Sequence, residues 1–82
     1  MFTVYAISSE IRNYIYVGLT SNLMKRIEFH NNGYEQTTKP YRPFRLIYNE
    51  EYPDRPSARE REKYLKTGIG KSFLKSLEQL KK

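Results

Sequence analysis

An 82-residue chain is the size of one domain, and we expect residues 1–82 to form a single one. The sequence has no cysteine, which excludes disulfides and Cys-ligated zinc, and its single histidine excludes a His-cluster zinc site. No stretch approaches the roughly 18 apolar residues of a membrane helix, and residues 1–7 lack the basic and apolar parts of a signal peptide. We therefore expect a soluble, cytoplasmic protein with no membrane partner.

The charge balance favours an anionic partner. The formal net charge is +6 at pH 7. Nucleic acid is the commonest partner of so basic a domain, and charge that only maintains solubility is the alternative. Charge alone does not separate these two interpretations.

The chain begins with two predicted strands. Residues 2–7 are rich in β-branched and aromatic side chains, and residues 14–18 form a second such run after a polar segment. We expect these strands to pair as an antiparallel hairpin with a loop near residues 9–12. This register places Tyr5 opposite Tyr16.

A helix is predicted to follow the hairpin. Thr20 or Ser21 is suited to cap its start, and Gly33 lies just past its end. Leu23 and Ile27 are one turn apart and should face the core. A polar row with a spacing of four residues lies on a different face and consists of Asn22, Arg26 and His30.

The second half of the chain predicts one strand and two helices. Residues 44–52 have the composition of a strand, and a capping-box signature at residues 57–60 predicts a helix that runs to about Lys66. Gly68 and Gly70 are expected to break the chain before a last amphipathic helix. The expected apolar face of that helix carries Phe73, Leu74, Leu77 and Leu80.

The order of the predicted elements is β-β-α-β-α-α. It indicates an α+β fold, in which a small three-stranded, mostly antiparallel sheet is flanked by helices. The sequence does not show which face of the sheet each helix covers.

Several kinds of chemistry are excluded by the residue types present. Cysteine chemistry is impossible, a Ser-His-Asp triad lacks its nucleophile elbow, and residues 68–71 lack the spacing of a P-loop. Phosphodiester hydrolysis needs a group to hold phosphate, a group to activate water and usually a metal ion. Arg26 suits the first task, and Tyr5, Tyr16 or His30 suits the second. A carboxylate suits the third.

The order of these residues resembles the GIY-YIG nuclease family. Thr3-Val4-Tyr5 and Tyr16-Val17-Gly18 match its two short strand motifs, with Thr3 in place of the family's glycine. Arg26 and His30 fall where its helix residues lie, and Glu62 falls where its metal-binding glutamate lies. The resemblance covers essentially the whole chain, and it is greatest to the small stand-alone members found in bacteria.

The resemblance implies a metal-dependent endonuclease. One Mg²⁺ or Mn²⁺ ion would have Glu62 as its only protein ligand, which suits an ion that keeps several waters. Arg26 would clamp the scissile phosphate, because its guanidinium is planar and always charged. For Glu62 the alternative is ordinary pairing with Arg59 or Lys66 on the helix surface.

The resemblance also implies that one tyrosine polarises the attacking water. We favour Tyr5 for this task and Tyr16 for orienting the phosphate, although the reverse assignment stays open. His30 could help to take the proton. The alternative for both tyrosines is simple cross-strand packing.

Basic side chains are expected to contact the phosphate backbone without reading sequence, so we expect little sequence specificity. DNA is the expected substrate ahead of RNA, although the sequence itself does not decide between them. The expected contacts are Lys39, Arg42, Arg45, Arg59, Lys66 and Lys71, together with Arg55, Arg61 and Lys63.

Two other functions are compatible with the sequence. Some family nucleases carry an asparagine after the glutamate-bearing helix, and none follows Glu62 here. A nucleic-acid-binding module that has lost catalysis is therefore the main alternative. A protein-interaction domain is the third possibility, since tyrosine is enriched at interfaces. Its candidate contacts are Tyr34, Tyr41 and Tyr52.

Overall fold

The computed structural model describes residues 1–80 and has the predicted α+β fold. Three strands, β1 (Phe2–Ser9), β2 (Ile15–Thr20) and β3 (Phe44–Tyr52), form an antiparallel sheet in the order β2-β1-β3. The helices are α1 (Leu23–Asn31), α2 (Arg55–Leu65), α3 (Gly68–Leu80) and a short 3₁₀ helix, η1 (Lys39–Tyr41). No helix in the described range is long and apolar enough to cross a membrane.

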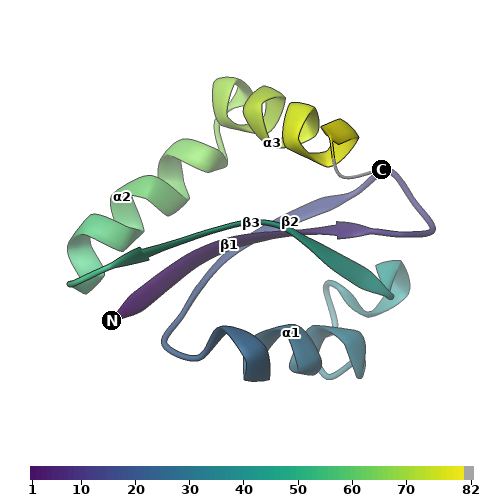
Figure 1. Ribbon diagram of the computed structural model, residues 1–82. Helices are drawn as coiled ribbons and strands as arrows, with labels where there is room; N and C mark the ends of the chain where they lie inside the picture. Colours follow the sequence, from purple (N-terminus) through teal and green to yellow (C-terminus); the bar gives the residue numbers. More distant parts are fainter. Residues whose placement is uncertain (81–82) are drawn as a thin grey trace.

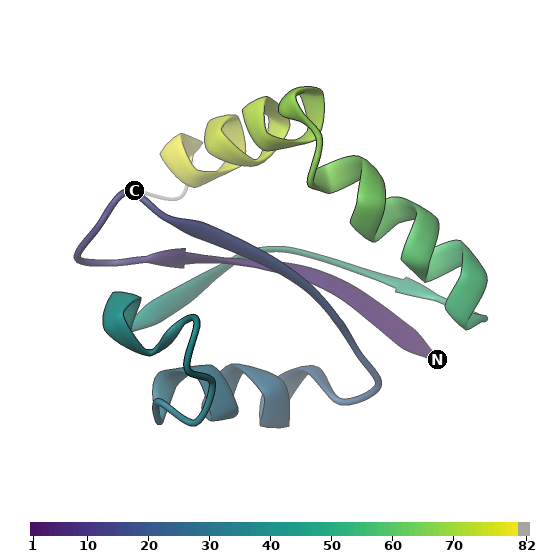
Figure 2. The same cartoon turned by 180° about the vertical axis from the view of Figure 1, so that it is seen from behind.

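The sheet lies between two helical layers (Figures 1 and 2). One face is covered by α2 and α3, and the other by α1 with η1. The central strand β1 is therefore enclosed on both sides, and seven of its eight residues are buried. A polar side chain on β1 must find a partner inside the protein, because water does not reach it.

Alternation along the strands divides the interior into two clusters. Val4 and Ala6 of β1 pack with Leu65 and Leu74 on the side of α2 and α3. Tyr5 and Ile7 pack on the opposite side, where Leu23 and Ile27 of α1 lie. The prediction that these two α1 residues face the core is confirmed.

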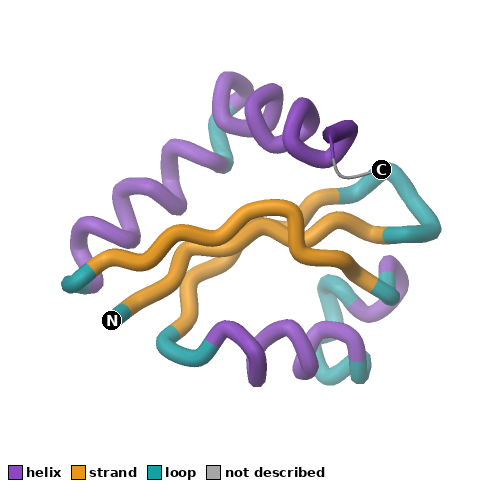
Figure 3. The backbone as a smooth tube through the Cα atoms, in the orientation of Figure 1, coloured by secondary structure: helices purple, strands orange, loops and turns teal. Residues whose placement is uncertain are grey.

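A β-bulge in β3 changes which residues face α2. Ala6 pairs with Tyr48 whereas Ile7 pairs with Leu46, so Ile47 is the extra residue. Ile47 and Tyr48 are consecutive, yet both pack against the cluster under α2 and α3. A bulge of this kind bends a strand and re-aims the side chains that follow it. The curvature of β3 is visible in the backbone trace (Figure 3).

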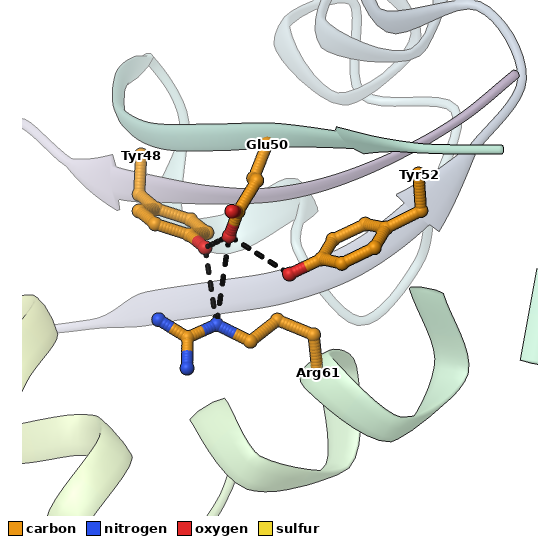
Figure 4. A network of polar contacts seen from close by, with 4 residues as sticks. All are labelled: Tyr48, Glu50, Tyr52 and Arg61. Carbon is orange, nitrogen blue, oxygen red and sulfur yellow. Dashed lines mark hydrogen bonds and ion pairs between the residues drawn. The ribbon is translucent and has the colours of Figure 1, made fainter. Parts of the chain in front are cut away.

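The residues after the bulge form a polar contact between β3 and α2 (Figure 4). Glu50 accepts hydrogen bonds from the hydroxyls of Tyr48 and Tyr52. Arg61 of α2 donates to the Tyr48 hydroxyl at 3.1 Å, and its Nε lies 3.7 Å from the Glu50 carboxylate. The guanidinium also lies 4.9 Å from the ring centroid of Tyr64. Arg61 is thus held by the protein itself rather than free to contact phosphate.

The hairpin register differs from the predicted one. Tyr5 pairs with Gly18, and Tyr16 pairs with Ile7, so the expected pairing of Tyr5 with Tyr16 was wrong. The turn lies later in the chain than expected, because β1 extends to Ser9 and β2 begins only at Ile15. The shift is two residues, which keeps both tyrosines on the face that α1 covers.

Two helix starts also differ from the prediction. Asn22, rather than Thr20 or Ser21, caps α1 and accepts from the backbone N–H of Lys25 at 3.2 Å. Asp54 caps α2 by accepting from the backbone N–H of Ser57 at 2.8 Å. The helix therefore begins at Arg55, and the capping box expected at residues 57–60 does not form its start.

The start of α3 was also predicted wrongly. Gly68 and Gly70 lie within this helix instead of breaking the chain. A Cβ on Gly70 would fall 2.5 Å from the Cα of Leu65, so the glycine allows α3 to start against the end of α2. Leu74 is fully buried as expected, but Leu80 is 81% exposed and lies outside the apolar face.

Candidate active site

The face of the sheet under α1 holds a cluster of polar aromatic side chains. Its innermost member is Tyr5, which has no exposed surface. The phenol of Tyr5 lies over Gly18 on the neighbouring strand, where a Cβ would be 2.5 Å from the hydroxyl oxygen. The glycine of the second strand motif is therefore needed to make room for the tyrosine of the first.

Tyr5 and His30 are joined by a buried hydrogen bond. The Tyr5 hydroxyl oxygen lies 2.9 Å from Nε2 of His30, which is also fully buried. The other ring nitrogen of His30, Nδ1, lies 2.9 Å from the hydroxyl oxygen of Thr38. His30, which was expected in a polar row away from the core-facing side of this helix, is thus an internal residue with both ring nitrogens bonded.

Arg26 lies at the outer side of this cluster and is only partly buried. Its guanidinium interacts with the hydroxyls of Tyr5 and Tyr16, and it lies 4.5 Å from the ring centroid of Phe29. Burial lowers the pKa of Arg26, but its interactions with the two tyrosines outweigh that effect and raise it. Arg26 therefore stays charged beside two phenols, in a position that solvent can reach.

Tyr16 completes the cluster on β2. Its ring centroid lies 4.8 Å from that of His30 and 6.3 Å from that of Tyr5. Unlike Tyr5, it is only partly buried. An incoming anion would therefore meet Arg26 and Tyr16 before it meets Tyr5 or His30.

The protonation states follow from burial. Burial raises the pKa of Tyr5 to about 12, against the lowering effect of Arg26. Burial, followed by the charge of Arg26, lowers the pKa of His30. A raised phenol pKa and a lowered imidazole pKa both favour the uncharged forms. At neutral pH the pair is a neutral tyrosine bonded to a neutral histidine.

Glu62 lies on the other helical layer, on α2. The residue is 8% exposed, and its carboxylate pairs with Arg59 at 3.6 Å and with Lys66 at 3.4 Å. Its charge helps to raise the pKa of Tyr5, which is the link between this carboxylate and the cluster under α1. Within residues 1–80, no group of three or more acidic, His or Cys side chains could hold a metal ion.

A lone carboxylate fits Mg²⁺ or Mn²⁺ better than it fits zinc. Zinc sites usually need three or four nitrogen or sulfur ligands, whereas Mg²⁺ is often held by one or two carboxylates, water and substrate phosphate. Glu62 supplies such an oxygen donor, although two cations neutralise it in the free protein. Any ion that binds here has to compete with Arg59 and Lys66.

The expected nucleic-acid contacts lie on both sides of the sheet. Lys39 and Arg42 are exposed beside Gly33, on the side of α1. Arg59 and Lys66 are exposed on α2 and bracket Glu62. Lys71 is exposed on α3, and the Nε of Arg45 is buried with no hydrogen-bond partner among the described residues.

Two of the tyrosines considered for protein contacts are engaged within the chain. Tyr41 stacks on Tyr14 with ring centroids 4.0 Å apart, and Tyr52 donates to Glu50 at 2.8 Å. Tyr34 remains 70% exposed. The set of free tyrosines that motivated a protein-interaction domain is therefore not present.

Thr38 is the site residue that the sequence analysis missed. It lies in the irregular segment before η1 and is fully buried against His30. Two consecutive threonines, Thr37 and Thr38, occupy this segment, and nothing in the sequence distinguishes them. Only the folded backbone turns the second one inward.

The comparison with protein families places the chain in a class of nucleases. The family model of the GIY-YIG catalytic domain matches residues 1–73, and the chain belongs to this family. Similar proteins are UPF0213 proteins, whose name states no activity. That of Staphylococcus haemolyticus is 37% identical over 68 residues, which cover 82% of this chain and 83% of that protein.

Two further UPF0213 proteins show how much of the relatives the chain covers. That of Pediococcus pentosaceus is 37% identical over 68 residues, 82% of this chain and 72% of that protein. That of Clostridium perfringens is 42% identical over 53 residues, 63% of this chain but only 57% of that protein. No solved structure matches the chain significantly.

Proposed function

We propose that this chain is a metal-dependent endonuclease that hydrolyses phosphodiester bonds in nucleic acid, with DNA as the substrate to test first. The observation that carries the proposal is the cluster of Tyr5, Tyr16, Arg26 and His30 on one face of the sheet. Cleavage would leave a 5′-phosphate and a 3′-hydroxyl. The proposal also takes residues 1–82 as one domain that acts in the cytoplasm.

Arg26 is proposed to hold the scissile phosphate. It is charged and partly open to solvent, and it adjoins both tyrosine hydroxyls. A guanidinium can donate two parallel hydrogen bonds to phosphate oxygens and offset the charge that develops on them. Tyr16, also partly exposed, would orient the same phosphate from β2.

Tyr5 is proposed to accept the proton of the attacking water. A phenol with a pKa of about 12 is a poor base, so it must first lose its own proton. His30 supports this step because its Nε2 lies 2.9 Å from the hydroxyl. Arg26 would stabilise the phenolate. Since Tyr5 is fully buried, substrate binding has to open a path to its oxygen.

Glu62 is proposed to be the protein ligand of one Mg²⁺ or Mn²⁺ ion. A bound divalent ion would polarise the phosphate and offset charge in the transition state. The pairing of Glu62 with Arg59 and Lys66 supports metal loading together with the substrate, because anionic phosphate offers both cations another partner.

A cleavage assay tests the proposal. Wild type, Glu62→Gln and Arg26→Lys would be incubated with labelled single-stranded, duplex and branched DNA and RNA in Mg²⁺, Mn²⁺ or EDTA. We expect metal-dependent cutting by wild type that both substitutions abolish while the circular dichroism spectrum is unchanged. If wild type cuts none of these substrates under any condition, the proposal fails.

A nucleic-acid-binding module without catalysis is the second candidate. It is favoured by the position of Glu62, which lies on the opposite helical layer from Tyr5 and is paired with two cations. This function predicts binding whose affinity falls steeply with salt, and no cleavage. Metal-dependent cutting lost in Glu62→Gln would exclude it.

A further inference from the structure

Thr38 joins His30 to the backbone through a second buried hydrogen bond. Its hydroxyl oxygen lies 2.9 Å from Nδ1 of His30 and 3.4 Å from the carbonyl oxygen of Glu35. The backbone N–H of Thr38 also donates to that carbonyl, at 3.2 Å. Thr38 and His30 have no exposed surface, so water does not substitute for either partner.

The donors and acceptors in this row of hydrogen bonds can be assigned from Arg26 inward. The Arg26 guanidinium beside the Tyr5 hydroxyl carries only N–H donors, so it cannot accept the Tyr5 O–H, which must find another acceptor. The neighbouring acceptor is Nε2 of His30 at 2.9 Å. A neutral imidazole with an unprotonated Nε2 carries its proton on Nδ1, and that N–H donates to Thr38. The Thr38 hydroxyl proton is then directed to the Glu35 carbonyl.

We propose that Thr38 is a positioning residue, which holds His30 in the Nδ1–H tautomer so that Nε2 accepts the hydroxyl proton of Tyr5. This inference rests on the proposed function for its catalytic meaning, but the tautomer is a property of the free protein. Thr38 touches neither substrate nor metal in this scheme; it acts through His30.

The proton step is balanced within the pair. The O–H bond of Tyr5 breaks and an N–H bond forms at Nε2, which gives a phenolate and an imidazolium. The imidazolium then donates from Nδ1 to Thr38 and from Nε2 to Tyr5. The charged groups that face His30 act in opposite directions, since Arg26 disfavours the imidazolium and Glu35 favours it. Tyr16, at a centroid distance of 4.8 Å, is the remaining titratable neighbour.

With valine at position 38, the hydrogen bond between His30 and Tyr5 should reverse its direction. Valine has nearly the shape of threonine but cannot accept from Nδ1, so an Nδ1–H proton would be buried without a partner. The imidazole would then favour Nε2–H, which donates to the Tyr5 oxygen. In that arrangement His30 cannot receive the tyrosine proton.

The test uses the fact that His30 is the only histidine in the chain. Two-dimensional ¹H–¹⁵N spectra of its ring would be recorded near pH 7.5 for wild type, Thr38→Val and Thr38→Ser. The exposed Thr37→Val is the matched control. We expect Nδ1–H in wild type, Thr38→Ser and Thr37→Val, and a shift toward Nε2–H in Thr38→Val. Nε2–H in wild type, or an unchanged tautomer in folded Thr38→Val, would overturn the proposal.

Kinetics of the same four proteins separate this inference from the proposed function. We expect Thr38→Val to lower kcat at least about tenfold with little change in KM, and Thr38→Ser to restore it. If wild type does not cut nucleic acid but shows the Nδ1–H tautomer that Thr38→Val alone shifts, the nuclease proposal fails and the tautomer assignment stands. If wild type cuts and Thr38→Val retains both kcat and tautomer, the assignment of Thr38 fails and the nuclease stands.

Discussion

The hydroxyl of Tyr5 occupies the space that a side chain on Gly18 would fill, with only 2.5 Å between that oxygen and a Cβ built on the glycine. The two residues pair across β1 and β2, so the contact is set by the register of the sheet. Tyr5 is enclosed on its other side by His30, and it cannot move away without breaking a buried hydrogen bond.

We therefore predict that Gly18→Ala displaces Tyr5 and destabilises the protein. The overpacking should lower the free energy of unfolding by about 1–3 kcal/mol and should reduce cleavage more than it reduces binding. Urea unfolding and the cleavage assay measure the two effects. Gly68→Ala is the control, because a Cβ there meets open space in a helix and should be neutral or mildly stabilising. Equal effects of the two substitutions would contradict the steric argument.

Substituting the two tyrosines separately distinguishes their tasks. Tyr5→Phe removes the hydroxyl that donates to His30, so we expect kcat to fall about 100-fold or more. Tyr16→Phe removes a hydroxyl at the partly exposed edge of the site, so we expect mainly a higher KM. Steady-state kinetics on one labelled duplex would show the difference. The reverse pattern would assign water activation to Tyr16.

The buried histidine makes stability depend on pH. The pKa of His30 is lowered from 6.5 in the folded protein, so the unfolded chain binds the proton more tightly. The contribution of neutral His30 to the free energy of unfolding should be fully present above about pH 6.5. It should fall as the pH drops from there through the pKa of the folded state. Folding also lowers the pKa of three carboxyl groups from ordinary values of 3.8–4.5, namely those of Glu35, Glu50 and Asp54. These groups lose their contribution to stability only at lower pH.

Urea midpoints measured at intervals between pH 8 and pH 5 would record this loss. His30→Gln provides the comparison, since it removes the titrating ring. We expect a slope between pH 6.5 and pH 5 in wild type and a flat profile in the variant. A wild-type profile that is flat in this window would mean that His30 is not buried in its neutral form.

Arg61 is predicted to contribute to stability rather than to substrate binding. Its ion pair with Glu50 is partly exposed and by itself is worth about 0–1 kcal/mol, but it also bonds Tyr48 and lies against the Tyr64 ring. Arg61→Ala should lower the free energy of unfolding by about 1–2 kcal/mol and should leave the KM for DNA nearly unchanged. Lys63→Ala, an exposed neighbour on the same helix, is the control for the unfolding measurement.

Much of the fold could be predicted because it depends on local patterns. Residues 44–52 were predicted as the third strand, and β3 has those bounds. The hairpin register could not be predicted from composition, since it depends on how far β1 extends before the turn. The caps were missed for a related reason: Ser57 and Asp54 both have capping side chains, and the choice between them is made by where Pro56 and the sheet place the first turn.

The candidate site was predictable in part. The spacing of four between Arg26 and His30 correctly placed them on one side of α1, but it did not show that His30 points inward while Arg26 reaches solvent. Thr38 was missed because its partner is eight residues away across an irregular loop. The position of Glu62 relative to Tyr5 depends on which face of the sheet α2 covers, and no local pattern encodes that choice.

The extra residue in β3 gives its two halves different neighbours. Phe44 and Leu46, before the bulge, pack toward α1, whereas Tyr48 and Glu50, after it, meet Arg61 on α2. Without the bulge, strict alternation along the same residues would put Tyr48 on the face of Phe44 and Leu46, so that Tyr48 would turn toward α1 and away from Arg61 on α2. The bulge at Ile47 therefore allows one strand to pack beside the polar aromatic cluster at one end and to hold α2 on the opposite face at the other.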